Sequence, residues 1–150
     1  MRQQGFSYVV MMFVVALLSI ASVRALEVTL TNERRDKEAE LLWRGQAYRD
    51  AIRDYYLNSP GTAQSFPAQL SDLLYDGRLT VPRRLLRKLY HDPMTSDGQW
   101  ALVRNDAGKV IGVRSLSTLK PLKQAGFPPE LASFTNAQHY SDWNFVFQPN

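Results

Sequence analysis

The order of apolar and polar positions divides the chain into an apolar start and a mixed remainder. Residues 6–23 form an apolar run without a charge, bounded by Arg2 and Arg24. The exceptions within the run are uncharged, at Ser7, Tyr8, Ser19 and Ser22. As a helix with a rise of ~1.5 Å per residue, the run would extend ~27 Å, close to the ~30 Å hydrocarbon core of a bilayer. The pattern therefore predicts a membrane-spanning helix over residues 6–26.

The helical pattern continues beyond residue 26, but the apolar positions narrow to one stripe. Residues 27–57 contain no proline and one glycine, Gly45, and are rich in good helix formers. Apolar residues share one helix face at Leu41, Tyr48, Ile52 and Tyr55, with Ala47 and Ala51 beside them. Favourable i,i+4 ion pairs are expected at Glu33–Lys37 and Glu40–Arg44. Turn-forming residues follow at 58–61, so we expect one long helix over about 6–57.

Short helices are predicted next. Residues 66–74 and 82–90 each place a proline in the first turn and leucines at helical spacing afterwards. In the second of these segments, the basic residues would share the opposite face. These are Arg83, Arg84, Arg87 and Lys88. Such a face is typically solvated, and contact with DNA phosphates or anionic lipid is the alternative.

The pattern then changes to the alternation of β-strands. Residues 99–104 and 109–114 flank a four-residue loop, 105–108, and so predict a β-hairpin. Residues 115–136 carry three prolines and are expected to be irregular. Residues 143–148 alternate large aromatic residues with others and predict a third strand. The fold class expected is α+β, with a small antiparallel sheet packed on the second half of the long helix.

Aromatic residues mark the expected core of this head. Trp143, Phe145 and Phe147 would point to one face of the sheet, because side chains alternate along a strand. Trp100 would lie on the first strand of the hairpin. A contact with the long helix explains this face better than a ligand platform does.

Composition and charge limit the kinds of function that the chain can have. The residues after Arg24 include 16 basic and 14 acidic ones, a net charge of only about +2. Nucleic-acid binders concentrate a larger basic excess, so nucleic acid is not expected as a partner. The chain has no cysteine, which excludes disulfides and thiolate chemistry and leaves export open.

Candidate catalytic or metal-binding residues are few. His91 and His139 are the two histidines, and neither has the spacing of a metal ligand or a catalytic triad. Asp92-Pro93 is explained by a helix end, and Asp97-Gly98 by a tight turn. We therefore expect no enzyme activity, no cofactor and no metal.

The amino-terminal segment allows two interpretations. A secretory signal peptide would be cut after Val23-Arg24-Ala25, although the apolar run is long for that class. A retained membrane helix fits the length better. Basic residues follow the apolar run as well as precede it, so the positive-inside rule leaves the orientation open.

The arrangement resembles the type IV pilin-like proteins, and among them the pseudopilins of type II secretion systems. The leader is short and polar, and Gly5-Phe6-Ser7 resembles the family's prepilin peptidase site. Phe66-Pro67 followed by Leu70 is similar to the family's Tyr-Pro…Leu segment. The stretch from Leu85 to Asp92-Pro93, with Trp100 after it, resembles a segment of the major pseudopilin.

The resemblance implies a domain organisation and a role. Residues 1–5 would be a leader peptide, cleaved after Gly5, and the new terminal residue Phe6 would be N-methylated. Residues 6–26 would form the transmembrane or filament-core helix, and residues 27–150 a periplasmic head. The chain would be a non-enzymatic subunit for protein secretion, held in the bacterial inner membrane by a single span. Its partners would be other pilin-like subunits, prepilin peptidase and the inner-membrane secretion platform.

Two departures from the family pattern bear on that role. The family carries a glutamate at the fifth mature residue, where this chain has Val10. The calcium loop of the major pseudopilin has no counterpart, because Asp142 is the single acid after Glu130. The first departure favours an accessory place in the filament. Two other roles stay open: a bitopic membrane protein with a binding head, and a periplasmic protein released after Ala25.

Overall fold

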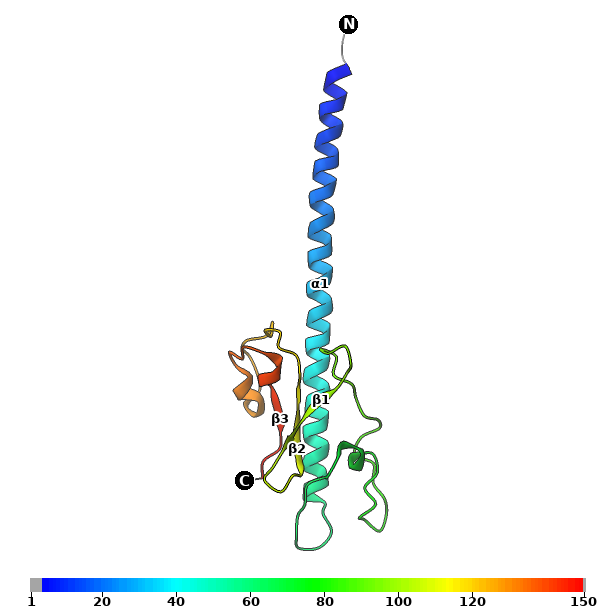
Figure 1. Ribbon diagram of the computed structural model, residues 1–150, viewed down its shortest axis with the longest axis vertical. Helices are drawn as coiled ribbons and strands as arrows, with labels where there is room; N and C mark the ends of the chain where they lie inside the picture. The colour runs from blue at the N-terminus through cyan, green and yellow to red at the C-terminus, as the bar shows by residue number, and fades with distance from the viewer. Residues whose placement is uncertain (1–3, 150) are drawn as a thin grey trace. The chain divides into compact units, whose positions relative to one another are not determined.

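The computed structural model of the protein describes residues 4–149 and has an α+β architecture (Figure 1). The helices are α1 (Gln4–Leu57) and three short 3-10 helices: η1 (Leu70–Leu73), η2 (Pro129–Phe134) and η3 (Tyr140–Asp142). The strands are β1 (Trp100–Arg104), β2 (Val110–Ser115) and β3 (Asn144–Val146). The chain divides into two compact units, one up to Asp36 and one from Lys37 onward.

Helix α1 agrees with the prediction of one long helix over about 6–57. It begins at Gln4, and it contains no proline to interrupt its hydrogen bonds. At its carboxyl end, Asn58 donates to the Asp54 carbonyl from both its main-chain and side-chain nitrogens, at 3.1 and 2.7 Å. The Arg78 guanidinium donates to the carbonyl of Tyr55 at 2.8 Å. These contacts satisfy carbonyl groups that the last turn of a helix leaves unpaired.

The second unit contains the sheet, whose strand order is β1-β2-β3 and whose pairs are all antiparallel. The predicted hairpin is confirmed: the amide of Asn105 donates to the Lys109 carbonyl at 2.9 Å. Gly108 has a φ of +72°, which a residue with a side chain rarely adopts. The third strand also forms where the alternation of residues 143–148 predicted it, although it is limited to Asn144–Val146.

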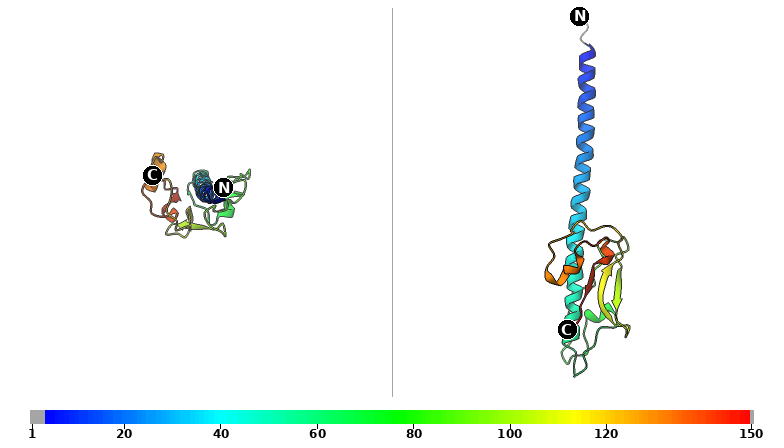
Figure 2. Two further views of the ribbon diagram at one scale, coloured as in Figure 1. Left: turned by 90° about the horizontal axis from the view of Figure 1, so that it is seen from above. Right: turned by 90° about the vertical axis from the view of Figure 1, so that its left-hand side faces the viewer.

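The core of this unit lies between the sheet and residues 38–55 of α1. The predicted apolar stripe is buried, with Leu41 and Ile52 at 0% exposure. From the sheet, Val113 and Phe145 are opposite each other on β2 and β3, and both are fully buried. Figure 2 shows the sheet lying along this part of α1, with the segment of residues 60–95 and the carboxyl-terminal region on either flank.

The prediction of a helix over residues 82–90 is wrong. This segment is extended and irregular, and Asp76 and Arg83 form an isolated β-bridge. The amides of Leu85 and Leu86 both donate to the carbonyl of Leu73, at 3.1 and 3.0 Å. These bonds hold the main chain against η1, so the donors of a helical turn are already used. The predicted helix over residues 66–74 is reduced to the single turn of η1.

Candidate functional surfaces

The apolar half of α1 presents side chains all around the helix without burying them in the chain. From Tyr8 to Leu30 the large apolar residues are exposed, and the most apolar 18-residue window has a mean hydropathy of 2.4. The hydroxyls of Ser19 and Ser22 donate to the carbonyls of Val15 and Leu18, each at 2.8 Å. These polar groups are therefore satisfied within the helix, as a hydrocarbon environment requires. Among the described residues, α1 is the one helix long and apolar enough to cross a membrane.

The residues of the expected processing site lie at the start of this helix. Gly5 and Phe6 are helical, and the side chain of Phe6 lies outside the described residues, as do residues 1–3 of the leader. Val10 is 45% exposed on α1. The position at which the resemblance implies a glutamate is thus an exposed apolar residue.

The four aromatic residues expected in the core differ in burial. Trp143 and Phe145 are fully buried, whereas Trp100 and Phe147 are partly buried and pack against the core. Phe145 contacts Trp100 edge to face, with ring centroids 6.3 Å apart. Phe145 therefore belongs to the contact between sheet and helix, at Gly45, and Phe147 contacts the ring of Tyr56 on α1. Trp143 packs instead on aromatic rings of the carboxyl-terminal region, stacked on Phe134 and edge to face with Phe127.

Gly45 allows β3 to approach the helix closely. A Cβ atom at this position would lie 2.4–2.5 Å from three carbons of the Phe145 ring. Such a distance is far inside van der Waals contact, so only glycine leaves room for the ring. The one glycine in residues 27–57, unexplained by the sequence, is a packing residue.

Glu38 is a buried acid on α1 that the sequence patterns did not single out. It is 6% exposed, and its carboxylate accepts hydrogen bonds from the amides of Leu122 and Lys123 and from the Tyr140 hydroxyl. The bonds from Leu122 and Tyr140 are both 2.7 Å long. Its position three residues before Leu41, on the apolar stripe, was the signal that could have revealed it. Glu38 fixes the carboxyl-terminal region to α1.

A second buried acid stabilises the loop after η1. Asp76 is 3% exposed and pairs with Arg78, with Nη2 2.8 Å from Oδ2. The hydrogen bonds from Arg78 hold the pKa of the Asp76 carboxyl below its usual value. The guanidinium also lies 3.4 Å from the centre of the Tyr55 ring, a cation–π contact. This cluster closes the end of α1 and offers no free group for chemistry.

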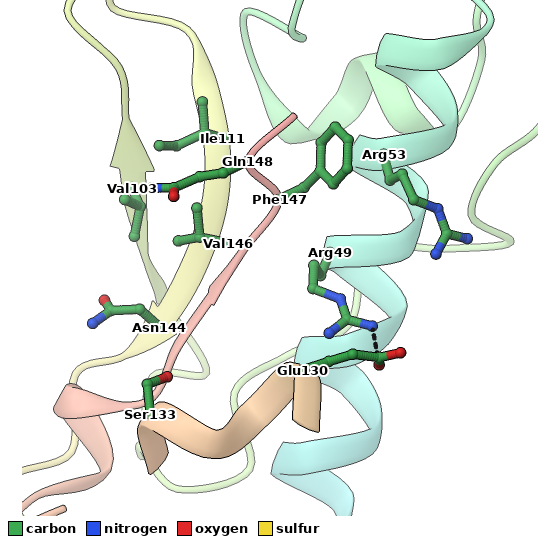
Figure 3. A pocket seen from close by; sticks show the side chains of 10 residues that line it. All are labelled: Arg49, Arg53, Val103, Ile111, Glu130, Ser133, Asn144, Val146, Phe147 and Gln148. Carbon is green, nitrogen blue, oxygen red and sulfur yellow. Dashed lines mark hydrogen bonds and ion pairs between the residues drawn. The ribbon is translucent and has the colours of Figure 1, made fainter. Parts of the chain in front are cut away.

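A groove with a volume of about 860 Å³ lies beside β3 (Figure 3). Apolar side chains of the sheet lie on one side of β3, and Arg49, Arg53 and Glu130 lie on the other. Arg49 contacts Glu130 at 3.1 Å and Asp50 at 3.0 Å. Arg53 contacts Asp50 and Asp54. The two cations are thus balanced within the chain, and Glu130, the one carboxylate of the lining, is paired with Arg49.

A smaller hollow, of about 410 Å³, lies on the flank of α1 next to the segment of residues 83–90. Trp43, Arg87, Lys88 and Tyr90 line it, together with the ion pair of Glu40 and Arg44. We call Trp43, Arg87, Lys88 and Tyr90 together the Trp43 surface. Trp43 is 58% exposed, and its ring meets Tyr90 edge to face, 5.1 Å between centroids. Trp43 lies off the apolar stripe of the helix, so the periodicity of the sequence contained no signal for it.

Tyr90 is held firmly in this surface. Its carbonyl accepts hydrogen bonds from the Tyr48 hydroxyl and the Trp100 indole, both at 3.0 Å, and its amide donates to the Tyr48 oxygen at 2.8 Å. Burial raises the pKa of Tyr48 to about 12, so this hydroxyl keeps its proton at neutral pH. Arg44 adds a hydrogen bond to the carbonyl of His91.

The residues that could do acid–base or metal chemistry are separated or already bound. Asp92 is 2% exposed and accepts hydrogen bonds from the Ser115 hydroxyl at 2.6 Å and from the Met94 amide at 2.8 Å. His139 lies 3.6 Å from Asp142 on the surface. Within residues 4–149, no group of three or more His, Cys, Asp or Glu residues is placed to hold a metal ion.

Comparisons of the chain with protein-family models, with characterised proteins and with solved structures gave no match.

Proposed function

We propose that this chain is a non-enzymatic, pilin-like subunit of a type II secretion or type IV pilus-like filament. In this proposal, prepilin peptidase cuts after Gly5 and Phe6 becomes the N-methylated first residue. Residues 6–26 anchor the chain in the bacterial inner membrane and later pack in a filament core. Residues 27–150 form a periplasmic head that contacts neighbouring subunits and takes part in protein secretion.

The observation that carries the proposal is that the two halves of α1 differ: the first is apolar and exposed, and the second is partly covered by the sheet. One unbroken helix from Gln4 to Leu57 supplies an exposed apolar half and then a half whose stripe is covered by a small antiparallel sheet. In such a helix, the first half can anchor the chain in a membrane and the second half forms part of the core of the head. This arrangement suits a subunit that leaves the bilayer by burying its apolar half against similar helices.

Val10 supports an accessory place rather than the repeating body of the filament. In pilin-like assemblies, the glutamate at this position is thought to neutralise the amino terminus of a neighbouring subunit. A charge buried without a partner is costly, so a subunit without the glutamate would be a poor repeating unit. We expect Val10→Glu to increase incorporation of the chain into filaments, measured by its ratio to the major subunit in sheared filament fractions. An unchanged ratio would contradict the role given to Val10.

The competing roles differ in how the amino terminus is processed. A periplasmic protein released after Ala25 would be cut in the middle of α1, which is continuous through this residue. A bitopic membrane protein with a binding head would keep Met1. The pilin-like subunit alone requires a cut between Gly5 and Phe6.

The deciding experiment expresses the full chain with and without prepilin peptidase and determines the intact mass and the amino-terminal sequence of the membrane-extracted protein. With the peptidase, the chain should begin at N-methylated Phe6. Without it, the chain should begin at Met1. Gly5→Val should block the cut, and Ser7→Ala, beside the site, serves as the matched control that should still be cut. A start at Met1 or Leu26 in the presence of the peptidase refutes the proposal.

A further inference from the structure

Four cations in the segment before Tyr90 have no acidic partner in the part of the chain that the structure describes. They are Arg83, Arg84, Arg87 and Lys88, and all four are exposed. The groove beside β3 differs in this respect, because Arg49 and Arg53 are matched by three carboxylates. Charge balance therefore distinguishes the hollow next to residues 83–90, which has unpaired cations beside it, from the groove beside β3, whose two cations are paired.

Two of these cations adjoin an exposed aromatic side chain. Arg87 and Lys88 line the same hollow as Trp43 and Tyr90. Three hydrogen bonds with Tyr48 and Trp100 fix the main chain of Tyr90, and its ring also packs edge to face on Tyr48, so the ring that Trp43 meets is held in place. A rigid aromatic platform loses little conformational entropy when it binds a ligand. Trp, Tyr and Arg are also the residues most enriched among the energetic anchors of protein–protein interfaces.

We infer that the Trp43 surface binds a protein partner that presents an acidic segment around one exposed apolar side chain. The apolar side chain packs on Trp43 within the hollow of about 410 Å³, and the carboxylates of the partner pair with Arg87 and Lys88. Arg83 and Arg84 extend the positive potential along the same segment and steer the encounter. This inference concerns the head alone and does not depend on processing at Gly5 or on filament assembly.

The same surface fits nucleic acid and lipid less well. Glu40 lies in the hollow with its side chain 48% exposed, and its carboxylate repels a closely spaced phosphate backbone. Single-stranded nucleic acid needs successive aromatic platforms, whereas Trp43 is the one aromatic residue of this hollow that is largely exposed. A carboxylate partner can place its charges to suit Arg87 and Lys88 and avoid Glu40.

The test measures binding of a labelled peptide, with two glutamates on each side of one phenylalanine, to the full chain in detergent micelles by fluorescence anisotropy. Trp43→Ala should weaken binding by roughly 10- to 30-fold, the loss typical of an aromatic anchor. Leu57→Ala is the matched control, because Leu57 is a similarly exposed apolar residue of α1, at 54%. This control should leave the affinity within about twofold of the unmodified chain.

A second pair of variants tests the charge. Arg87→Glu with Lys88→Glu should weaken binding by at least roughly tenfold. Lys109→Glu with Arg114→Glu makes the same change in net charge on β2 and the hairpin loop, where both residues are exposed, and should have a much smaller effect. Equal losses for the two charge variants, or for Trp43→Ala and Leu57→Ala, would overturn the inference.

The choice of partner class is tested in parallel. A peptide with lysine in place of glutamate should not bind, and binding of the acidic peptide should fall as salt rises. A thymidine oligonucleotide of equal charge and vesicles containing phosphatidylglycerol should bind more weakly than the acidic peptide. Tighter binding of either one, with the same loss in Trp43→Ala, would assign the surface to nucleic acid or to lipid and overturn the inference.

Discussion

The contact between Gly45 and Phe145 leads to a stability prediction that opposes the usual effect of the substitution. Replacing glycine by alanine inside a helix normally stabilises it by about 1 kcal/mol. Here the added methyl group would lie 2.4–2.5 Å from three carbons of a ring that is 0% exposed. The ring cannot move away easily, because Trp100 and Phe134 contact it at centroid distances of 6.3 and 5.0 Å.

The magnitude follows from the two opposing effects. Overpacking a filled core costs roughly 1–3 kcal/mol, and three simultaneous close contacts place this site at the upper end. After subtraction of the gain in helix propensity, we expect Gly45→Ala to lower the free energy of unfolding by about 2 kcal/mol. For a domain of this size, that loss lowers the melting temperature by roughly 6–10 °C.

The assay is urea and thermal unfolding of a head fragment comprising residues 27–150. Ala39→Gly, at an exposed position of α1, measures the helix propensity alone and should cost about 1 kcal/mol. In a Phe145→Leu background, Gly45→Ala should become neutral or stabilising, since the clashing ring is gone. If Gly45→Ala stabilises the fragment while Phe145 is present, the close approach of helix and strand is refuted.

Three further predictions concern the same fragment. Phe145→Ala should destabilise it by about 3–5 kcal/mol in urea unfolding, and a loss under ~1 kcal/mol would contradict the burial of this ring. Glu38→Gln should cost about 2 kcal/mol and speed hydrogen exchange of the Leu122 and Lys123 amides, whereas unchanged exchange would argue against the anchor. Asp76→Asn tests a pH dependence. The pKa of Asp76 is lowered in the folded state, so the ionised carboxylate stabilises the fold at pH values above the unfolded pKa, near ~3.9. This stabilisation disappears as the pH falls through the folded pKa. The unfolding midpoints of the two proteins should therefore converge as the pH falls below ~3.9, and a constant difference would refute the assignment.

The parts of the fold that the sequence predicted depend on local signals. The extent of α1 follows from the absence of proline in residues 4–57, and the hairpin from the turn residues 105–108 between two alternating runs. The apolar stripe with Leu41 and Ile52 is visible as a periodicity of one helix. Each of these signals lies within one continuous segment of the chain, so no knowledge of distant partners is needed.

The parts that escaped prediction depend on contacts between distant segments. Residues 82–90 have a helical pattern of leucines, yet Leu73 holds them extended through hydrogen bonds that no local rule includes. Glu38 is buried by partners 84, 85 and 102 residues away in the sequence. The prominence of Trp43 likewise depends on Tyr90, which the folded chain brings beside it. Tertiary structure therefore decided each of these cases.

The shortness of β3 affects whether this edge of the sheet can pair with a strand of another copy of the chain. β3 is one of the two edges of the sheet and pairs with β2 on one side, so its outer main-chain groups form a template for another strand. The strand is limited to three residues, Pro149 follows closely, and the ion pair of Arg49 and Glu130 lies in the groove beside it. A short edge with charges and a proline nearby resists aggregation by edge-to-edge pairing. Two copies that meet at the β3 edge would thus touch through side chains there, and their sheets would not pair at this edge.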